Sequence, residues 1–97
     1  MTEIIISKSK NINKKYDARI DGKKTVSFGA AGMSDFTKHK DTERKQKYLN
    51  RHKKNENWSD HTTAGFYATN ILWNKETITQ SVKDTNKRFK NINIKLK

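Results

Sequence analysis

The stretch YDARIDGKKTVSF, residues 16–28, decides how this chain folds. Apolar and polar side chains alternate on both sides of Asp21-Gly22, a pattern typical of strands with one buried face. The Asp-Gly pair suits a tight turn, because glycine readily adopts the positive φ that such turns need. Residues 14–30 are therefore predicted to form a β-hairpin. Its apolar positions are Tyr16, Ala18, Ile20, Val26 and Phe28.

The residues after the hairpin predict two capped helices. Ser34 or Asp35 can cap a short helical turn that reaches His39, and Asp41 can cap a longer helix over residues 42–54. On this longer helix, basic side chains recur at steps of three and four residues, which places them on one face. This basic stripe consists of Arg44, Lys47, Arg51 and Lys54.

The segment TTAGFYATNILW, residues 62–73, contains no acid or base and is predicted to be the central helix. A last helix should begin after Thr77, which can cap it while Gln80 completes a capping box. The tail NINIKLK, residues 91–97, alternates with period two. It is either a strand that pairs with the hairpin or a basic arm.

Together these elements predict an α+β fold. We expect a small single domain in which a β-hairpin is followed by three or four short helices, with a possible C-terminal strand. Residues 1–13 are expected to be an N-terminal arm or strand, residues 14–90 a single basic α+β domain, and residues 91–97 a basic tail or strand. The absence of Pro and the presence of only four Gly argue against a low-complexity linker.

Composition removes several classes of protein. The chain has 97 residues, of which 31% are hydrophobic, and it has no Cys. No apolar run approaches the roughly 18 residues of a spanning helix, so no membrane association is expected. Without Cys there is neither a disulfide framework nor a thiolate zinc site. No basic segment precedes the short run Ile4-Ile5-Ile6, so a secretory signal is not expected either.

Positive charge dominates the composition, since 22 Lys and Arg against 10 Asp and Glu give a net charge of +12. The charge gathers in three blocks: residues 8–24 hold seven bases and two acids, residues 38–54 eight and two, and residues 83–97 six and one. Solubility alone requires a net charge of only about 2 to 8 in a small domain. The blocks therefore predict contact with the phosphates of a nucleic acid, and an acidic protein surface is the alternative partner.

The predicted nucleic acid is DNA in preference to RNA, bound without sequence specificity. Lys outnumbers Arg by 18 to 4, and Lys offers a point charge rather than the planar fork that reads base edges. The second block should make the main contacts, while the hairpin and the C-terminal part add secondary ones. The predicted nucleic-acid-binding residues are Lys38, Lys40, Arg44, Lys47, Arg51, Lys53, Lys54, Lys14, Lys15, Lys23, Lys24 and Arg88.

Three histidines, His39, His52 and His61, raise the question of catalysis. With nearby carboxylates they could hold a divalent ion beside a phosphate, as in a metal-dependent nuclease. Their spacing fits no metal motif, since there is no His-Glu-x-x-His and no Cys. We therefore expect no enzymatic activity, no metal and no cofactor. We interpret His39 and His52 as side chains that pack on a helix and bond to a carboxylate.

Several segments carry a family resemblance: VSFG at residues 26–29, SDFTKHKD at 34–41, AGF at 64–66 and LWNK at 72–75. In this order, within residues 14–90, they resemble short uncharacterised proteins of large nucleocytoplasmic DNA viruses. The resemblance implies a viral protein that is not secreted and is found in the virion or in the host cytoplasm or viral factory. With the basic blocks it predicts genome packaging or condensation, and the alternative is a minor capsid protein that bridges acidic virion surfaces.

Overall fold

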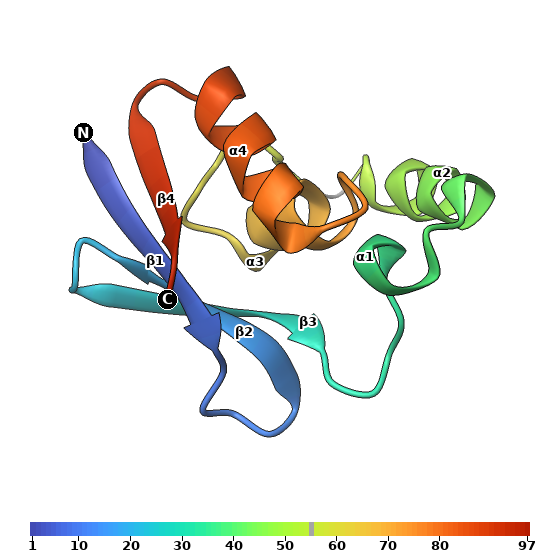
Figure 1. Cartoon of the computed structure of the whole chain (residues 1–97), viewed down its shortest axis with the longest axis horizontal. Helices are drawn as coiled ribbons and strands as arrows, with labels where there is room; N and C mark the ends of the chain where they lie inside the picture. The colour runs from blue at the N-terminus through green and yellow to red at the C-terminus, as the bar shows by residue number, and fades with distance from the viewer. Residues whose placement is uncertain (55) are drawn as a thin grey trace.

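The structure, a computed structural model, describes residues 1–54 and 56–97. Four strands form one sheet in the order β3-β2-β1-β4 (Figure 1). β1 runs antiparallel to β2 and parallel to β4, and β2 runs antiparallel to β3. The strands are β1 (Thr2–Lys8), β2 (Lys14–Ile20), β3 (Lys24–Ala30) and β4 (Ile92–Leu96).

Five helical segments complete the fold and confirm the predicted α+β class. Asp35, Asp41 and Thr77 cap α1, α2 and α4 with their side chains, as their residue types predicted. Among the described residues, none of the helices has the length and apolar character to cross a membrane. The helical segments are α1 (Phe36–His39), α2 (Thr42–His52), α3 (Ala64–Tyr67), the π-helix η1 (Ala68–Leu72) and α4 (Ile78–Arg88).

The hydrophobic core lies between one face of the sheet and the helices α3, η1 and α4 (Figure 1). The sheet contributes every second residue of its strands, because successive side chains point to opposite faces. The helices contribute both aromatic and aliphatic side chains. The buried core residues are Ile4, Ile6, Ala18, Ile20, Val26, Phe28, Ile92 and Ile94 from the sheet, and Phe66, Tyr67, Ile71, Leu72 and Val82 from the helices.

The hairpin turn has the predicted chemistry. Asp21 and Gly22 both have positive φ, 50° and 67°, and the Lys23 N–H donates to the Ile20 carbonyl oxygen at 2.9 Å. Because Ile20 pairs with Lys24, three residues, 21–23, connect the two strands. A second glycine, Gly29, has a φ of 78° where the hairpin meets the helices. A Cβ atom at Gly29 would lie 2.7 Å from Leu72 Cδ1, so this position needs glycine for both its conformation and its close packing.

Both termini belong to the sheet. The tail forms β4, which pairs with β1 instead of with the hairpin strands that we considered. At the outer edge of β4, the Ile94 N–H donates to Asn86 Oδ1 at 2.7 Å. In return Asn86 Nδ2 donates to the Ile94 carbonyl oxygen at 3.0 Å. The side chain of a residue on α4 therefore covers part of the free sheet edge.

The prediction of one regular helix over residues 62–73 was wrong in detail. The segment starts at Ala64, after the Thr63 cap, and changes from α-helix to π-helix at Ala68. Asn70 Nδ2 donates to the carbonyl oxygen of Phe66 at 2.9 Å. This contact occupies the carbonyl that the Asn70 N–H would use in an α-helix. A side chain of the segment itself thus replaces a backbone hydrogen bond of the α-helix, and the apolar periodicity of the sequence does not reveal this change.

Candidate nucleic-acid interface

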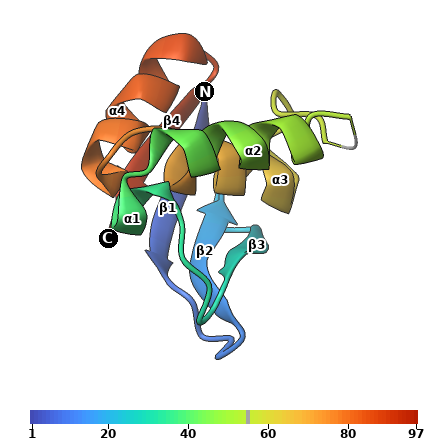
Figure 2. The same cartoon turned by 90° about the vertical axis from the view of Figure 1, so that its right-hand side faces the viewer.

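Helix α2 carries most of the predicted contact residues and lies at one end of the molecule, beyond α1 and α3 (Figures 1 and 2). None of its residues is buried. It begins at the Asp41 cap, where Asp41 Oδ1 accepts from the Glu43 N–H at 3.0 Å and the Arg44 N–H at 3.3 Å. It ends at His52 rather than at residue 54. Lys53 and Lys54 therefore follow the helix instead of extending its stripe.

A stack of aromatic rings attaches α2 to the rest of the domain. The Tyr48 ring lies 4.1 Å from the His52 ring and 4.2 Å from the Trp73 ring, centroid to centroid, and is nearly parallel to Trp73. The ring of His39 on α1 lies 5.3 Å from Trp73. We call these four rings the aromatic stack. Burial, followed by the nearby negative charge of Glu56, raises the pKa of Tyr48 to about 12, so its hydroxyl stays neutral.

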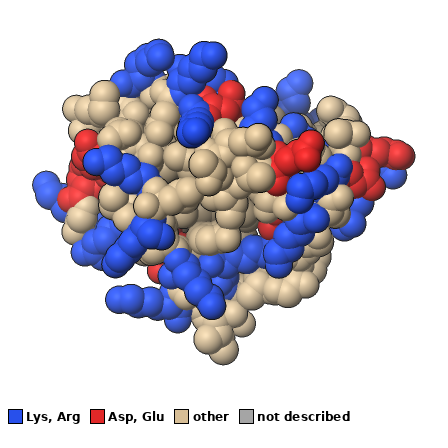
Figure 3. Space-filling view, viewed as in Figure 1, with Lys and Arg blue, Asp and Glu red and all other residues tan. Residues whose placement is uncertain are grey.

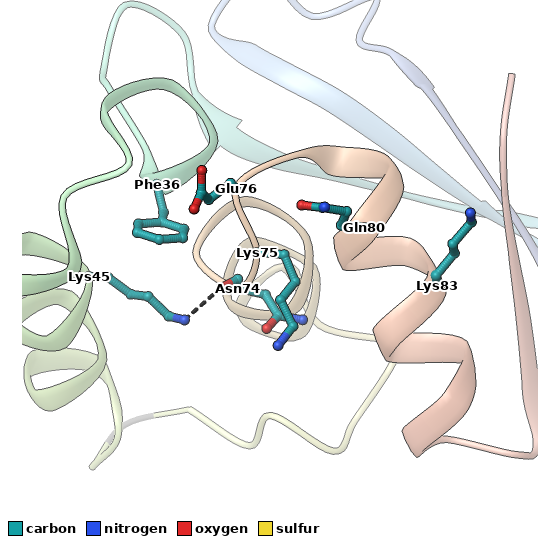
Figure 4. A pocket seen from close by; sticks show the side chains of 7 residues that line it. All are labelled: Phe36, Lys45, Asn74, Lys75, Glu76, Gln80 and Lys83. Carbon is teal, nitrogen blue, oxygen red and sulfur yellow. Dashed lines mark hydrogen bonds between the residues drawn. The ribbon is translucent and has the colours of Figure 1, made fainter.

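On the same side of α2, next to the aromatic stack, Lys45 provides a second attachment (Figure 4). Its ammonium donates to the Asn74 carbonyl oxygen at 2.6 Å and lies 4.9 Å from the centroid of the Phe36 ring. Burial lowers the pKa of Lys45, and the nearby ammonium of Lys75 lowers it further, against the opposing effect of Asp84. Lys45 and the aromatic stack therefore attach the same side of α2, and the exposed bases Arg44, Lys47 and Arg51 lie on the neighbouring face of the helix.

A cleft separates α2 from the loop between β3 and α1. It consists of two adjoining hollows of about 480 and 630 Å³, and four residues line both of them: Met33, Arg44, Arg51 and Trp73. Lys47 lines the larger, outer hollow of about 630 Å³ but not the inner one. We call the two hollows together the α2 cleft. Three bases of the predicted stripe thus surround one concave surface.

A third hollow, of about 540 Å³, continues the cleft along the same loop. It shares Lys15 and Asp35 with the α2 cleft, and exposed bases from β1, β2 and α1 line it. The structure therefore brings together bases from distant parts of the sequence. We call this set the basic track, and it consists of Lys8, Lys14, Lys38, Arg44, Lys47 and Arg51.

Lys15 does not belong to this exposed set, which corrects its prediction as a contact residue. Its ammonium forms an ion pair with Asp35 Oδ2, and the two side chains are only 10% and 3% exposed. Asp35 also caps α1 by accepting from the Thr37 N–H at 2.9 Å. A buried carboxylate requires a partner of opposite charge, and Lys15 is that partner. The pair contributes no net charge to the track.

Arg88 is also engaged within the domain, although its side chain is 42% exposed, and its predicted contact with nucleic acid stays a prediction. Its Nε donates to Asp84 Oδ2 at 2.8 Å, and a terminal nitrogen donates to Asn70 Oδ1 at 2.7 Å. A hydrogen bond from Asn74 lowers the pKa of Asp84, and the bond and charge of Arg88 lower it further, against the opposing effect of burial. Arg88 thus fixes the π-helix to α4.

The remaining predicted residues are exposed but scattered. Lys23 and Lys24 lie at the far end of the hairpin from Lys14, about 20 Å away along a strand that rises ~3.3 Å per residue. Lys40 lies between α1 and α2. Figure 3 shows Lys and Arg around the rim of one face, with a mostly uncharged band across its centre. The structure therefore concentrates only part of the charge on the basic track.

Two of the three histidines, His39 and His52, have structural contacts. His52 Nδ1 lies 3.1 Å from Glu56 Oε2, and Trp58 Nε1 donates to Glu56 Oε1 at 2.9 Å, so His52 has the predicted carboxylate partner. His39 does not, because its Nδ1 accepts from the backbone N–H of Asp41 at 2.9 Å. Within residues 1–54 and 56–97, no group of three or more His, Cys, Asp or Glu side chains is placed to hold a metal ion.

The profile of a family of unknown function, DUF5754, matches residues 4–52. The chain belongs to this family. The match extends from β1 to the end of α2 and includes every residue of the basic track. Neither the search of curated proteins nor that of solved structures gave a significant match. The DUF5754 match does not bear on the viral resemblance, which stays a prediction.

Sequence reasoning missed two residues of this region. Lys8 was counted in the first charged block but was placed in an arm or strand of open role, and its pairing in β1 brings it beside Lys14 and Lys38. Met33 received no role, although its side chain is 64% exposed in the middle of the α2 cleft. The sequence signal that could have identified Met33 is a large apolar residue in a loop that contains Gly29 and Gly32.

Proposed function

We propose that the protein binds nucleic acid through its phosphate backbone, without sequence specificity, along the basic track. The observation that carries the proposal is that six exposed bases from four elements line three neighbouring hollows, each of which shares lining residues with the next. Among the described residues that line these hollows, Asp35 is the only acid, and Lys15 already neutralises it. Each phosphate that a Lys or Arg neutralises releases counterions from the nucleic acid, which favours binding.

The bases of α2 are available for this role. Arg44 and Arg51 are exposed at the α2 cleft. Lys47 is 3.5 Å from Glu43, but both side chains are more than two-thirds exposed, 71% and 80%. Such a surface pair contributes about 0–1 kcal/mol and yields readily to a phosphate. The aromatic stack and Lys45 attach α2 through one face, so the neighbouring face with Arg44, Lys47 and Arg51 stays exposed.

DNA is the proposed partner. If the protein is viral, as the resemblance predicts, its proposed role is packaging or condensation of the viral genome. The predicted alternative is a capsid protein that bridges acidic virion surfaces. In that role the tail, residues 91–97, would add a strand to the sheet of a neighbouring protein. In the structure β4 is paired with β1, and Asn86 covers Ile94 at its outer edge. These contacts favour the nucleic-acid proposal over a role in which the tail joins another sheet.

The test is the salt dependence of duplex DNA binding, measured by fluorescence anisotropy between about 50 and 200 mM salt. The triple variant R44Q/K47Q/R51Q should bind more weakly and should flatten the slope of log K against log salt by about 3, since each phosphate contact contributes about 0.9. Glutamine keeps side-chain length and helix propensity close to those of the original residues.

The matched control is K83Q/K87Q/K90Q, which removes the same charge from exposed positions on and just after α4. This control should retain most of the wild-type slope, because α4 lies away from the basic track. Equal slopes for the two triple variants would overturn the track as the binding surface. Absence of salt-dependent binding by the wild-type protein would overturn the proposed function itself.

A further inference from the structure

The inner hollow of the α2 cleft differs from the rest of the basic track in its lining. Its lining includes three small residues, Gly29, Ala30 and Ala68, and three rings of the aromatic stack, Tyr48, His52 and Trp73. The thioether of Met33, on the loop, faces the same space. We call this hollow of about 480 Å³ the inner pocket. It is an apolar space within a cationic surface, which phosphate binding alone does not require.

Polar groups surround this apolar space. The exposed side chains of Arg44 and Arg51 lie on the α2 side, Ser34 lines the pocket from the loop, and the ion pair of Lys15 with Asp35 lines it as well. Guanidinium groups bind phosphate oxygens in pairs of parallel hydrogen bonds. A hydroxyl group can donate to or accept from the polar edge of a heterocycle. The pocket therefore combines apolar walls, a polar contact and two phosphate-binding groups.

We propose that the inner pocket binds one unpaired nucleobase of a single-stranded nucleic acid, with the adjoining phosphates on Arg44 and Arg51. This inference rests on the proposed function and names its substrate. The pocket volume lies within the range of about 300–1,000 Å³ that small-molecule sites occupy. A base presents apolar faces and a polar edge, which matches the lining. Bases of a duplex are stacked and paired, so they reach such a pocket only at the cost of unstacking.

The way in which the base makes contact also follows from the geometry. Both faces of the Tyr48 ring are covered, because His52 and Trp73 stack on it at 4.1 and 4.2 Å. A base therefore meets the edges of the aromatic stack and the side chain of Met33 instead of inserting between rings. The aromatic stack stays intact on binding, and α2 keeps its position.

The decisive variant fills the pocket without changing charge. Ala30 is exposed at the end of β3 and lines the inner pocket, so Ala30→Leu should occupy the space of the base. Ala31 is also exposed but lines the neighbouring hollow, so Ala31→Leu is the matched control. The probes are a fluorescent single-stranded oligonucleotide of mixed sequence and a duplex of the same length.

The wild-type protein should bind the single strand more tightly than the duplex. Ala30→Leu should lower affinity for the single strand on the order of 10-fold, as expected for the loss of one base contact, and leave duplex affinity and the salt slope unchanged. Ala31→Leu should change neither. Met33→Ser, at a 64% exposed loop position that the fold does not need, should also weaken single-strand binding. It therefore provides an independent test if Ala30→Leu does not fold.

Competition experiments distinguish a strand from a free nucleotide. Adenosine 5′-monophosphate at millimolar concentration should displace the single strand from the wild-type protein, and inorganic phosphate at the same ionic strength should not. If the protein binds the nucleotide but shows no preference for the single strand over the duplex, the pocket takes a free nucleotide, and the proposed single strand is wrong. The pocket inference fails, while the proposed function stands, if R44Q/K47Q/R51Q weakens single-strand binding but Ala30→Leu and Met33→Ser do not.

Discussion

The body of the domain and helix α2 are built on different principles. In the body, η1 buries four of its five residues, and α4 buries Ser81, Val82 and Thr85. Helix α2 buries none of its 11 residues and is attached through the aromatic stack and Lys45. The body is therefore stabilised by removal of apolar surface from water, whereas α2 depends on a few side-chain contacts. The difference leaves the basic face of α2 free for a partner.

The largest expected effect comes from a cavity in the body. Phe28 is 1% exposed, and its ring lies 5.9 Å from that of Tyr16 and 5.4 Å from that of Tyr67. Phe28→Ala should lower the free energy of unfolding by about 3–5 kcal/mol, because the lost contacts leave a cavity. Urea denaturation followed by circular dichroism measures this loss, and a change below about 1 kcal/mol would contradict the description of the core.

A smaller and more local effect is expected at the aromatic stack. Tyr48→Ala removes the ring contact of α2 with Trp73 and the ring contact with His52 within the helix, each worth about 0.5–1.5 kcal/mol. Amide hydrogen exchange should become faster in α2, while the amides of β1 and β2 keep their protection. Tyr48→Phe is the control and should preserve the wild-type pattern, since it keeps the ring. Faster exchange throughout the sheet would show that α2 is an integral part of the body.

The smallest expected effect comes from removal of a helix N-cap, and this change can be made both in α2 and in the body of the domain. Asp41 caps α2 and Thr77 caps α4, each through its side-chain oxygen. Replacement of either cap by Ala costs about 1 kcal/mol. For Thr77→Ala this cost should appear as a lower urea midpoint of the whole domain. For Asp41→Ala it should appear mainly as faster amide exchange in α2, and equal shifts of the urea midpoint would argue against the comparison.

The parts of the fold that depend on neighbouring residues could be predicted from the sequence. The alternation around Asp21-Gly22 specified the hairpin, and the polar residues at Asp35, Asp41 and Thr77 specified where helices begin. Each of these features is a local property of the backbone and of the side chain next to it. The same reasoning identified the basic stripe of α2, because its spacing follows directly from helix geometry.

The features that join distant residues could not be predicted in this way. The pairing of β1 with β4 joins the two ends of the chain, and the ion pair of Lys15 with Asp35 spans 20 residues. Lys15 could not be distinguished from an exposed Lys by its neighbours. The sequence likewise showed the basic residues of the track but not the hollows that they line. The hollows of the α2 cleft form only when the β3–α1 loop lies against α2.

The contact between Asn86 and Ile94 has a consequence for self-association. A parallel edge strand normally presents unpaired N–H and C=O groups that attract the strands of other molecules. Here the carboxamide of Asn86 forms the two hydrogen bonds with the N–H and C=O of Ile94 that a neighbouring strand would otherwise form. A chain with a net charge of +12 already repels its copies in solution, but a polyanion would remove that repulsion and crowd the copies together. If the protein binds a polyanion as proposed, Asn86 would then keep neighbouring copies from pairing through the backbone of Ile94.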